Sequence, residues 1–458
     1  MLAPLLASLL GAIALPRAPA EADLIVHIPR LDQLAGLVAF FDAAGKHSPL
    51  LRPSTWRSEF HPIIEVDIAR AESIVGSGID PTASATLSFL GGDRLTCTTL
   101  ADVKSFEARV SEKLGSLGEG WASRANGAVL HGATSGGRVT AGYAIRGRGV
   151  CAVSSAADGE TMLKDAAKLL DTPPDSKRWT ALQSVPGSLY LVLRHFTIGL
   201  SGGRSKLSLS GRATGVTFPR FEPARASPYA DLTSSGLLFV RAHLERGSRA
   251  ELASSVLSDG KVICPQCDAR ELHQFIDAVV EGLTGNVALR VDAAQLTGSF
   301  KTPLTRYFAF KHAYLAEVDK PDKIQRALDR AASWWGAKRT AEGIALSTDA
   351  GEVQIGLRGS QLYVANHATA LGQVWQALAA RPARLEHGAE LSVDAHQIAL
   401  ALSQISLFDA VSSRELATLL AISSEIGPLL DASRPIQGWA DSASDGTQRF
   451  ALTWTLLP

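Results

Sequence analysis

Residues 138–154, RVTAGYAIRGRGVCAVS, and residues 352–366, EVQIGLRGSQLYVAN, share one pattern that decides the predicted fold. Each stretch contains two runs in which apolar residues alternate with small or polar ones, as in a β-strand with one buried face. An Arg-Gly pair separates the runs, Arg146-Gly147 in the first stretch and Arg358-Gly359 in the second. Because Gly readily adopts positive φ at a strand-to-strand turn, both stretches predict a β-hairpin.

The sequences around the two hairpins follow the same order. A helix with apolar residues at helical spacing precedes each hairpin, and another follows it. The matched segments are Val103–Leu114 with Lys323–Trp335, Glu160–Leu170 with Leu371–Ala380, Asp23–Ile28 with Leu237–Ala242, Ala85–Phe89 with Val287–Val291, Pro186–Leu200 with His387–Leu402, and Lys206–Phe218 with Gln448–Leu457. This order predicts an internal repeat; the alternative is two unrelated α+β domains with a similar rhythm.

After residue 20, the sequence divides into three segments: a first repeat, a linker and a second repeat. The first repeat is predicted at residues 21–218 and the second at residues 236–458. The linker between them, residues 219–235, is rich in Pro, Ser and Ala and poor in periodic apolar positions, which is typical of a connecting segment.

The alternation within the strands, as in Val139–Ile145 and Val353–Leu357, predicts the fold class. Strands of parallel sheets are buried on both faces and are continuously apolar, whereas alternating strands are typical of antiparallel sheets with one face covered. We therefore predict an α+β protein of two tandem repeats, each a mostly antiparallel sheet covered on one face by helices.

The composition excludes some classes of partner. The 458 residues include 45 Lys and Arg against 45 Asp and Glu, so no net charge steers the chain towards nucleic acid or an anionic bilayer. Hydrophobic residues make up 46% and charged residues 20%, which fits a folded protein with a large core and not a disordered chain.

The first twenty residues predict export. Met1–Leu15 is an apolar stretch too short for a comfortable membrane span, and Ala18-Pro19-Ala20 offers the small residues that a signal peptidase recognises. We expect a signal peptide at residues 1–20, cleavage before Glu21, and a periplasmic or secreted protein. The alternative is a buried N-terminal helix. After cleavage no transmembrane segment is expected, because no later stretch approaches 18 consecutive apolar residues.

The signal peptide, the two copies of strand, helices and paired strands, and a helix start of the type Asp-x-x-x-Phe (Asp102–Phe106) together resemble a group of bacterial envelope proteins. These are tandem α+β proteins grouped only as a domain of unknown function. The resemblance implies the compartment and the repeat. It implies no activity, and no catalytic residue is carried over from it.

Cys264-Pro265-Gln266-Cys267 precedes a predicted helix, Ala269–Leu283. A Cys-x-x-Cys pair at a helix start is how thiol oxidoreductases hold their redox cysteines, because the positive end of the helix lowers a thiol pKa. No thioredoxin-like frame surrounds the motif, so we favour a local disulfide that clamps the start of the helix. A zinc site would need two more ligands, and His273 is the only nearby candidate.

The other two cysteines, Cys97 and Cys151, lie in strand-like runs of the first repeat. They are candidates for a cross-strand disulfide, and two buried thiols are the alternative. All four cysteines are therefore disulfide candidates.

Two short motifs raise the possibility of hydrolase chemistry. Gly199–Gly203 matches the nucleophile-elbow pattern G-x-S-x-G, but an alternating strand follows it where a helix is required. Ser258–Lys261 matches S-x-x-K, but its Asp-Gly indicates a turn and the companion motifs are missing. The eleven histidines show no metal-binding spacing. The sequence thus predicts no catalytic residue, no metal site and no cofactor.

The function predicted from these observations is a non-catalytic, exported envelope protein with a binding or scaffolding role. A groove between sheet and helices is the expected site, because such clefts hold apolar ligands or partner segments. A lipid or another envelope protein is the partner to expect. The alternatives are an exported hydrolase and a thiol redox protein using Cys264 and Cys267.

Overall fold

The computed structural model describes residues 15–48, 51–52, 61–176, 179–215, 219–223, 225–229, 236–248, 264, 267–296, 302–376, 378, 383–412 and 414–458. Most of the expected signal peptide and the Ser258–Lys261 motif lie outside these residues. The chain divides into two compact units, Met1–Thr214 and Gly215–Pro458. Within the described part of the chain, no helix is both long and apolar enough to cross a membrane.

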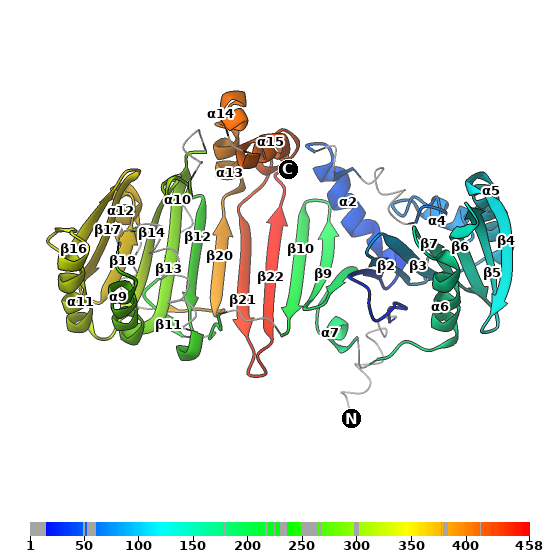
Figure 1. Cartoon of the computed structure of the whole chain (residues 1–458), viewed down its shortest axis with the longest axis horizontal. Helices are drawn as coiled ribbons and strands as arrows, with labels where there is room; N and C mark the ends of the chain where they lie inside the picture. The colour runs from blue at the N-terminus through cyan, green and yellow to red at the C-terminus, as the bar shows by residue number, and fades with distance from the viewer. Residues whose placement is uncertain are drawn as a thin grey trace. The chain divides into compact units, whose positions relative to one another are not determined.

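The first unit is an antiparallel sheet with helices packed on it (Figure 1). Its strands are β1 (Leu24–Ile28), β2 (Ala85–Leu90), β3 (Asp93–Thr99), β4 (Glu119–Ala125), β5 (Ala128–Ser135), β6 (Arg138–Arg146), β7 (Gly149–Ser154), β8 (Leu189–Leu193), β9 (Phe196–Gly203) and β10 (Lys206–Ala213). Its helices are η1 (Leu31–Leu34), α2 (Ala35–Ala44), α4 (Ala71–Gly76), α5 (Val103–Leu117), α6 (Gly159–Asp171) and α7 (Thr180–Gln183). Strand pairing gives the order β4-β5-β6-β7-β3-β2-β1-β8-β9-β10.

The second unit is also an antiparallel sheet with helices. Its main strands are β12 (Leu238–His243), β13 (Leu283–Ala294), β14 (Phe310–Val318), β15 (Lys338–Arg339), β16 (Gly343–Thr348), β17 (Gly351–Arg358), β18 (Gln361–Ala365), β20 (Ala389–Val393), β21 (Ile436–Ser442) and β22 (Gln448–Thr455). Its helices are η4 (Arg246–Ser248), α9 (Ala269–Gly282), α10 (Pro303–Phe308), α11 (Pro321–Trp334), α12 (Ala368–Gln376), α13 (Ala395–Ser403), α14 (Leu407–Ser412) and α15 (Arg414–Asp431). The strand order is β15-β16-β17-β18-β14-β13-β12-β20-β21-β22.

The fold class α+β is shown by the mixture of helices and antiparallel strands. The two predicted hairpins are present as β6–β7 and β17–β18, with pairing Arg146↔Gly149 and Arg358↔Gln361. Each loop has two residues and begins with a glycine at positive φ, 58° at Gly147 and 60° at Gly359. Gly at the first loop position is what a type II′ hairpin turn requires.

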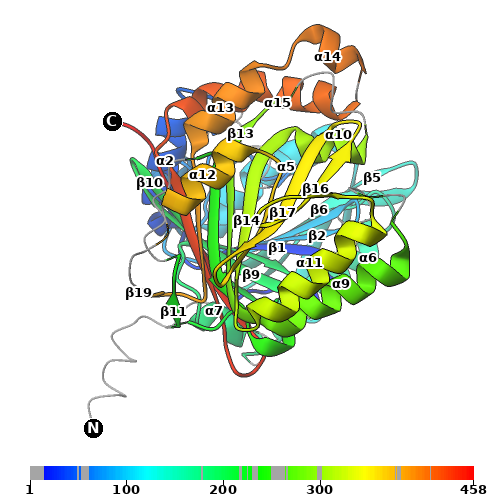
Figure 2. The same ribbon diagram turned by 90° about the vertical axis from the view of Figure 1, so that its left-hand side faces the viewer.

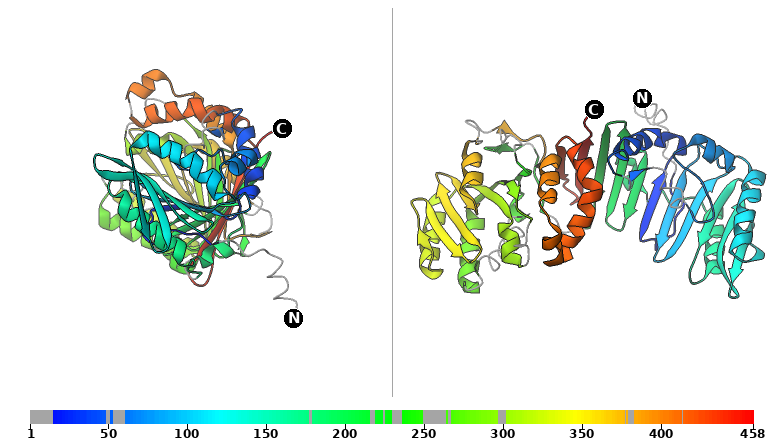
Figure 3. Two further views of the ribbon diagram at one scale, coloured as in Figure 1. Left: turned by 90° about the vertical axis from the view of Figure 1, so that its right-hand side faces the viewer. Right: turned by 90° about the horizontal axis from the view of Figure 1, so that it is seen from above.

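Helices cover both faces of each sheet, which corrects the prediction of one covered face. In the first unit, β6 turns Tyr143 towards the core beneath α5 and Ala144 towards the core beneath α6. Figure 3 (left) shows α5 and α6 on opposite sides of the strands. In the second unit, α9 and α11 lie on one face and α12 on the other (Figure 2). The second face was missed because several of its strand positions, such as Ala144, Ala288 and Ala313, carry alanine, which looks neutral in an alternation pattern.

The described residues between β20 and β21 of the second unit form three helices, whereas a two-residue loop joins β8 to β9 in the first. The match between Pro186–Leu200 and His387–Leu402 therefore holds only for the first strand of each segment. The chain leaves β20 at Asp394, whose side chain accepts a hydrogen bond from the Gln397 backbone N–H. This N-cap starts α13, because it satisfies a backbone donor that the helix itself leaves without a partner.

Part of the predicted linker belongs to the second unit. β11 (Ala226–Ser227) pairs with β19 (Ala383–Arg384), and Phe221 forms an isolated bridge to Leu244. The Tyr229 hydroxyl donates to Gln361 Oε1 at 2.5 Å. Tyr229 is fully buried, so this segment is held by packing as well as by hydrogen bonds.

The structure contains both disulfides expected from the sequence, Cys97–Cys151 and Cys264–Cys267. Cys97 and Cys151 face each other on β3 and β7, and both side chains are buried. This disulfide spans 54 residues of sequence, whereas Cys264–Cys267 spans three.

The double substitution Cys97→Ala and Cys151→Ala should lower the free energy of unfolding by about 2–4 kcal/mol, because it releases a long loop in the unfolded chain. Urea unfolding followed by circular dichroism measures this change. The matched control, Cys264→Ala with Cys267→Ala, should cost less, since it releases only a short loop. Equal losses in the two variants would contradict this account.

Candidate binding site in the second unit

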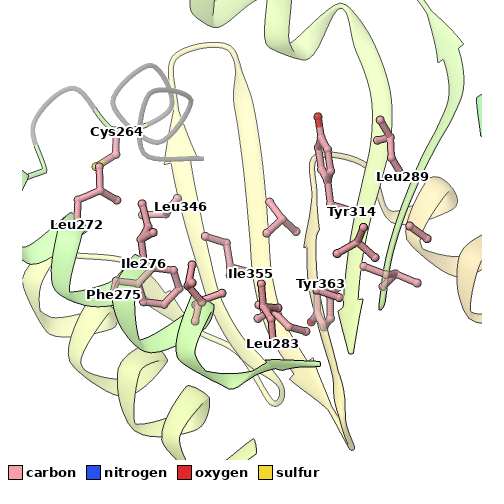
Figure 4. A pocket seen from close by; sticks show the side chains of 18 of the residues that line it. Cys264, Leu272, Phe275, Ile276, Leu283, Leu289, Tyr314, Leu346, Ile355 and Tyr363 are labelled. Atoms are coloured by element: carbon pink, nitrogen blue, oxygen red, sulfur yellow. The ribbon is translucent and has the colours of Figure 1, made fainter. Parts of the chain in front are cut away.

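A cavity of about 370 Å³ lies in the second unit between one face of the sheet and α9 (Figure 4). Its described lining comes from β12, β13, β14 and β16–β18, from α9 and the two cysteines before it, from Tyr307 of α10, and from Trp335 at the end of α11. The lining residues are Val240, Cys264, Cys267, Leu272, Phe275, Ile276, Val279, Val280, Leu283, Val287, Ala288, Leu289, Tyr307, Tyr314, Leu315, Ala316, Trp335, Leu346, Ile355, Leu362, Tyr363 and Val364. None of them is Asp, Glu, Lys, Arg or His.

The floor of the cavity consists of two cross-strand rows of side chains on one face of the sheet. Alternate residues of a strand share a face, and antiparallel pairing sets them opposite one another. The first row is Val240, Leu289, Tyr314, Val364 and Ile355, and the second is Val287, Ala316 and Leu362. Both rows cross at least three strands, so the floor is a continuous apolar surface.

The wall of the cavity is the apolar stripe of α9. Leu272, Phe275, Ile276, Val279 and Val280 follow the spacing i, i+3, i+4, i+7, i+8, which places them on one side of the helix. The helix starts at Asp268, whose carboxylate accepts hydrogen bonds from the backbone N–H groups of residues 270 and 271. The stripe packs together with α11 into one core cluster.

The Cys264–Cys267 disulfide lies at the start of α9 and contributes to the lining. Cys264 is 4% exposed and belongs to the same core cluster as the apolar stripe of α9. Cys267 is half-buried and packs against the same cluster, so a disulfide in apolar surroundings fits the clamp at the helix start better than an accessible redox pair. His273 is exposed and its Nδ1 lies 3.1 Å from the Ala269 carbonyl oxygen, and no cluster of metal-ligating side chains occurs among the described residues.

The polar atoms of the side chains on the cavity face are the hydroxyls of Tyr307 and Tyr314, the indole N–H of Trp335 and the disulfide sulfurs, whereas the Tyr363 ring lies in the core beneath α12 on the other face. The Tyr363 hydroxyl donates to Glu342 Oε2 at 3.2 Å, and burial together with Glu342 raises the pKa of Tyr363 to about 12. Tyr314 is 41% exposed, so the cavity reaches solvent beside it. Because none of the described lining residues is charged, those residues offer no acid-base pair or charged nucleophile. The apolar lining of the cavity is suited to binding an apolar ligand.

His312 packs against two tyrosines of the lining, Tyr307 and Tyr314, which mark what we call the tyrosine end of the cavity. Its ring packs edge-on against Tyr307, with the ring centroids 4.5 Å apart, and Nδ1 lies 2.9 Å from the Phe310 carbonyl oxygen. Its Nε2 is buried with no hydrogen-bond partner among the described residues. Burial lowers the pKa of His312, so this end of the cavity is uncharged near neutral pH.

The G-x-S-x-G motif is not a nucleophile elbow. Gly199–Gly203 lies inside β9, and Ser201 pairs with Ser208 of β10. The residues at the motif are therefore part of a sheet ladder, without the strand-to-helix turn that would expose a catalytic serine.

A polar network on the second unit was not predicted. Asn286 donates through Nδ2 to Glu317 Oε2 at 2.7 Å, and the His243 ring lies 2.9 Å from Asn286 Oδ1. Thr284 Oγ1 also donates to Glu317. The hydrogen bonds within this set indicate a structural role that ties strand ends together.

No family model and no curated protein matches the chain. Among solved structures, crystal form I of TP0453 matches 79% of this chain and 96% of its own, with 11% sequence identity and a TM-score of 0.23. A likeness of this size gives no ground for assigning a fold family or an activity.

The lowered pKa of His312 predicts an acid dependence of stability. The unfolded chain takes up a proton near pH 6.5, whereas the folded protein resists protonation until lower pH, so the contribution of His312 is present above pH 6.5 and is lost as the pH falls. His312→Phe keeps a ring but cannot titrate. Urea midpoints between pH 7.5 and 5 should therefore fall more steeply for the wild type than for this variant. Parallel curves would contradict the assignment.

Proposed function

We propose that this chain is a non-catalytic, exported binding protein whose second unit holds an apolar ligand in the groove between the sheet and α9. The observation that carries the proposal is the cavity itself, with two apolar rows as floor and the α9 stripe as wall. Its volume of about 370 Å³ falls in the range of about 300–1,000 Å³ that is typical of small-molecule sites.

The compartment is part of this proposal. Two disulfides among four cysteines fit an oxidising compartment. We place the protein in the periplasm or outside the cell, with residues 1–20 as the signal peptide and a lipid or another envelope protein as the source of the apolar group.

The proposal also includes a duplicated fold. Among the described residues, the ten main strands of each unit occur in the same spatial order and with the same pairings, and α5 and α11 occupy the same place in that order. Two tandem repeats explain this agreement more simply than two unrelated domains.

The two alternatives have less support. A hydrolase would need convergent polar groups in the cavity, and its described lining carries no charged residue. A thiol oxidoreductase would need an accessible cysteine, whereas Cys264 is 4% exposed and Cys267 is half-buried against the same core cluster.

Binding of N-phenyl-1-naphthylamine, an uncharged fluorescent probe of apolar sites, tests the proposal. The wild type should bind it saturably with one site. Val279→Asp places a carboxylate in the wall of the cavity and should weaken binding by about tenfold or more at pH 7.5, because a buried charge without a partner is costly. Fluorescence titration of the full chain measures both affinities.

Gln274→Asp is the matched control, since it adds the same charge to the exposed side of the same helix. It should leave the affinity unchanged. Ala316→Phe fills the floor without adding charge and should also weaken binding, which keeps the test valid if Val279→Asp unfolds. Absence of saturable binding by the wild type, or equal affinities for all variants, would refute the proposed function.

A further inference from the structure

The short helix α14 presents its apolar side to solvent. Leu407 is 75% exposed and Phe408 and Val411 are each 90% exposed, whereas Asp409 is half-buried. The spacing of the three apolar residues places them on one side of the helix. Ser406 and Asp409 fix this orientation, because the backbone N–H of each donates to the side chain of the other at 3.2 Å. Amphipathic helices normally bury their apolar side, so α14 is inverted.

This apolar surface of Leu407, Phe408 and Val411 is connected to the cavity. α14 lies at the outer end of the helical insertion, beside α13 and α15 (Figures 1 and 2). The first turn of α15 pairs Glu415 with Arg306 of α10 at 2.8 Å. The next residue of α10, Tyr307, lines the cavity at its tyrosine end. The exposed surface and the open end of the cavity thus belong to one connected group of elements.

The size of the surface favours a lipid over a protein. A stable protein interface buries about 800 Å² per partner and involves about 20–30 residues, which three side chains do not supply. A lipid surface needs only an apolar helix side that enters the boundary between headgroups and acyl chains.

The charges near α14 indicate which kind of lipid surface it can contact. Residues 404–431 contain four carboxylates, at positions 409, 415, 425 and 431, and one basic residue, Arg414. An anionic bilayer would repel such a segment. Attraction must therefore come from the apolar side chains, and it is compatible with a zwitterionic surface.

We propose that α14 inserts Leu407, Phe408 and Val411 into a lipid surface and so brings the tyrosine end of the cavity to the source of its ligand. The ligand-loading part rests on the proposed function, whereas the surface contact stands on the exposed side chains alone. The partner is a bilayer with uncharged or zwitterionic headgroups.

Flotation of the full chain with phosphatidylcholine vesicles tests the contact. The triple substitution Leu407→Ser, Phe408→Ser and Val411→Ser should lower the bound fraction by about fivefold or more, because it removes the inserting side chains. The control Val75→Ser with Leu117→Ser removes two exposed apolar side chains of the first unit and should leave binding unchanged. Phosphatidylglycerol added to the vesicles should not increase binding.

A second measurement separates this proposal from the proposed function. The triple variant should bind N-phenyl-1-naphthylamine from solution as the wild type does, but take it up from preloaded vesicles about fivefold more slowly. If the wild type binds the probe from solution but not the vesicles, or if the triple variant floats like the wild type, the lipid contact is refuted and the cavity stands. If sedimentation shows a wild-type dimer that the triple variant loses, the partner is a second copy, which also refutes the lipid contact.

Discussion

Burial of both faces of the same strands is the constraint on which the rest of the structure depends. Adjacent residues such as Tyr143 and Ala144 enter two different cores, one beneath α5 and one beneath α6. A slip of one residue in the pairing would exchange the two cores, so the register is strongly specified. The glycine turn at Gly147 and the Cys97–Cys151 disulfide reinforce the register locally.

Much of this arrangement could be predicted from the sequence, whereas the rest depends on contacts between distant segments that local sequence patterns do not reveal. Alternation and the Arg-Gly pairs predicted both hairpins, and an Asp at the N-cap accompanies the start of α5 as well as of α9. The second covered face was missed because small residues, which allow a helix to pack closely on the sheet, do not stand out as apolar positions in the sequence. A Cβ at Gly142, for instance, would lie 2.8 Å from Leu163 Cδ1 of α6. The insertion of helices α13–α15 was missed because local sequence patterns do not reveal it; it becomes apparent only when the two units are compared strand by strand.

The cavity illustrates the same limit. The sequence predicted a groove between sheet and helices and, separately, a disulfide of Cys264 and Cys267 at a helix start, but none of the strand residues that form the floor. Val240, Leu289 and Tyr314 become neighbours only through the antiparallel pairing of three strands. The α9 stripe was visible as helical periodicity, yet the same periodicity is expected of any helix that packs on a core. Which apolar surface stays partly unfilled depends on the register of distant segments.

The two units show how one strand order accommodates different interiors. On the face that carries α5, the first unit places Ile63, Ile64, Val66 and Ile74 in the core, and each is almost fully buried. On the face that carries α11, the described part of the second unit leaves a cavity of about 370 Å³ among Val, Leu and Phe side chains. An apolar cavity destabilises a fold, because its lining loses contacts, and a dry one binds apolar molecules readily. A ligand that fills this cavity restores those contacts, so binding and stability of the second unit are linked.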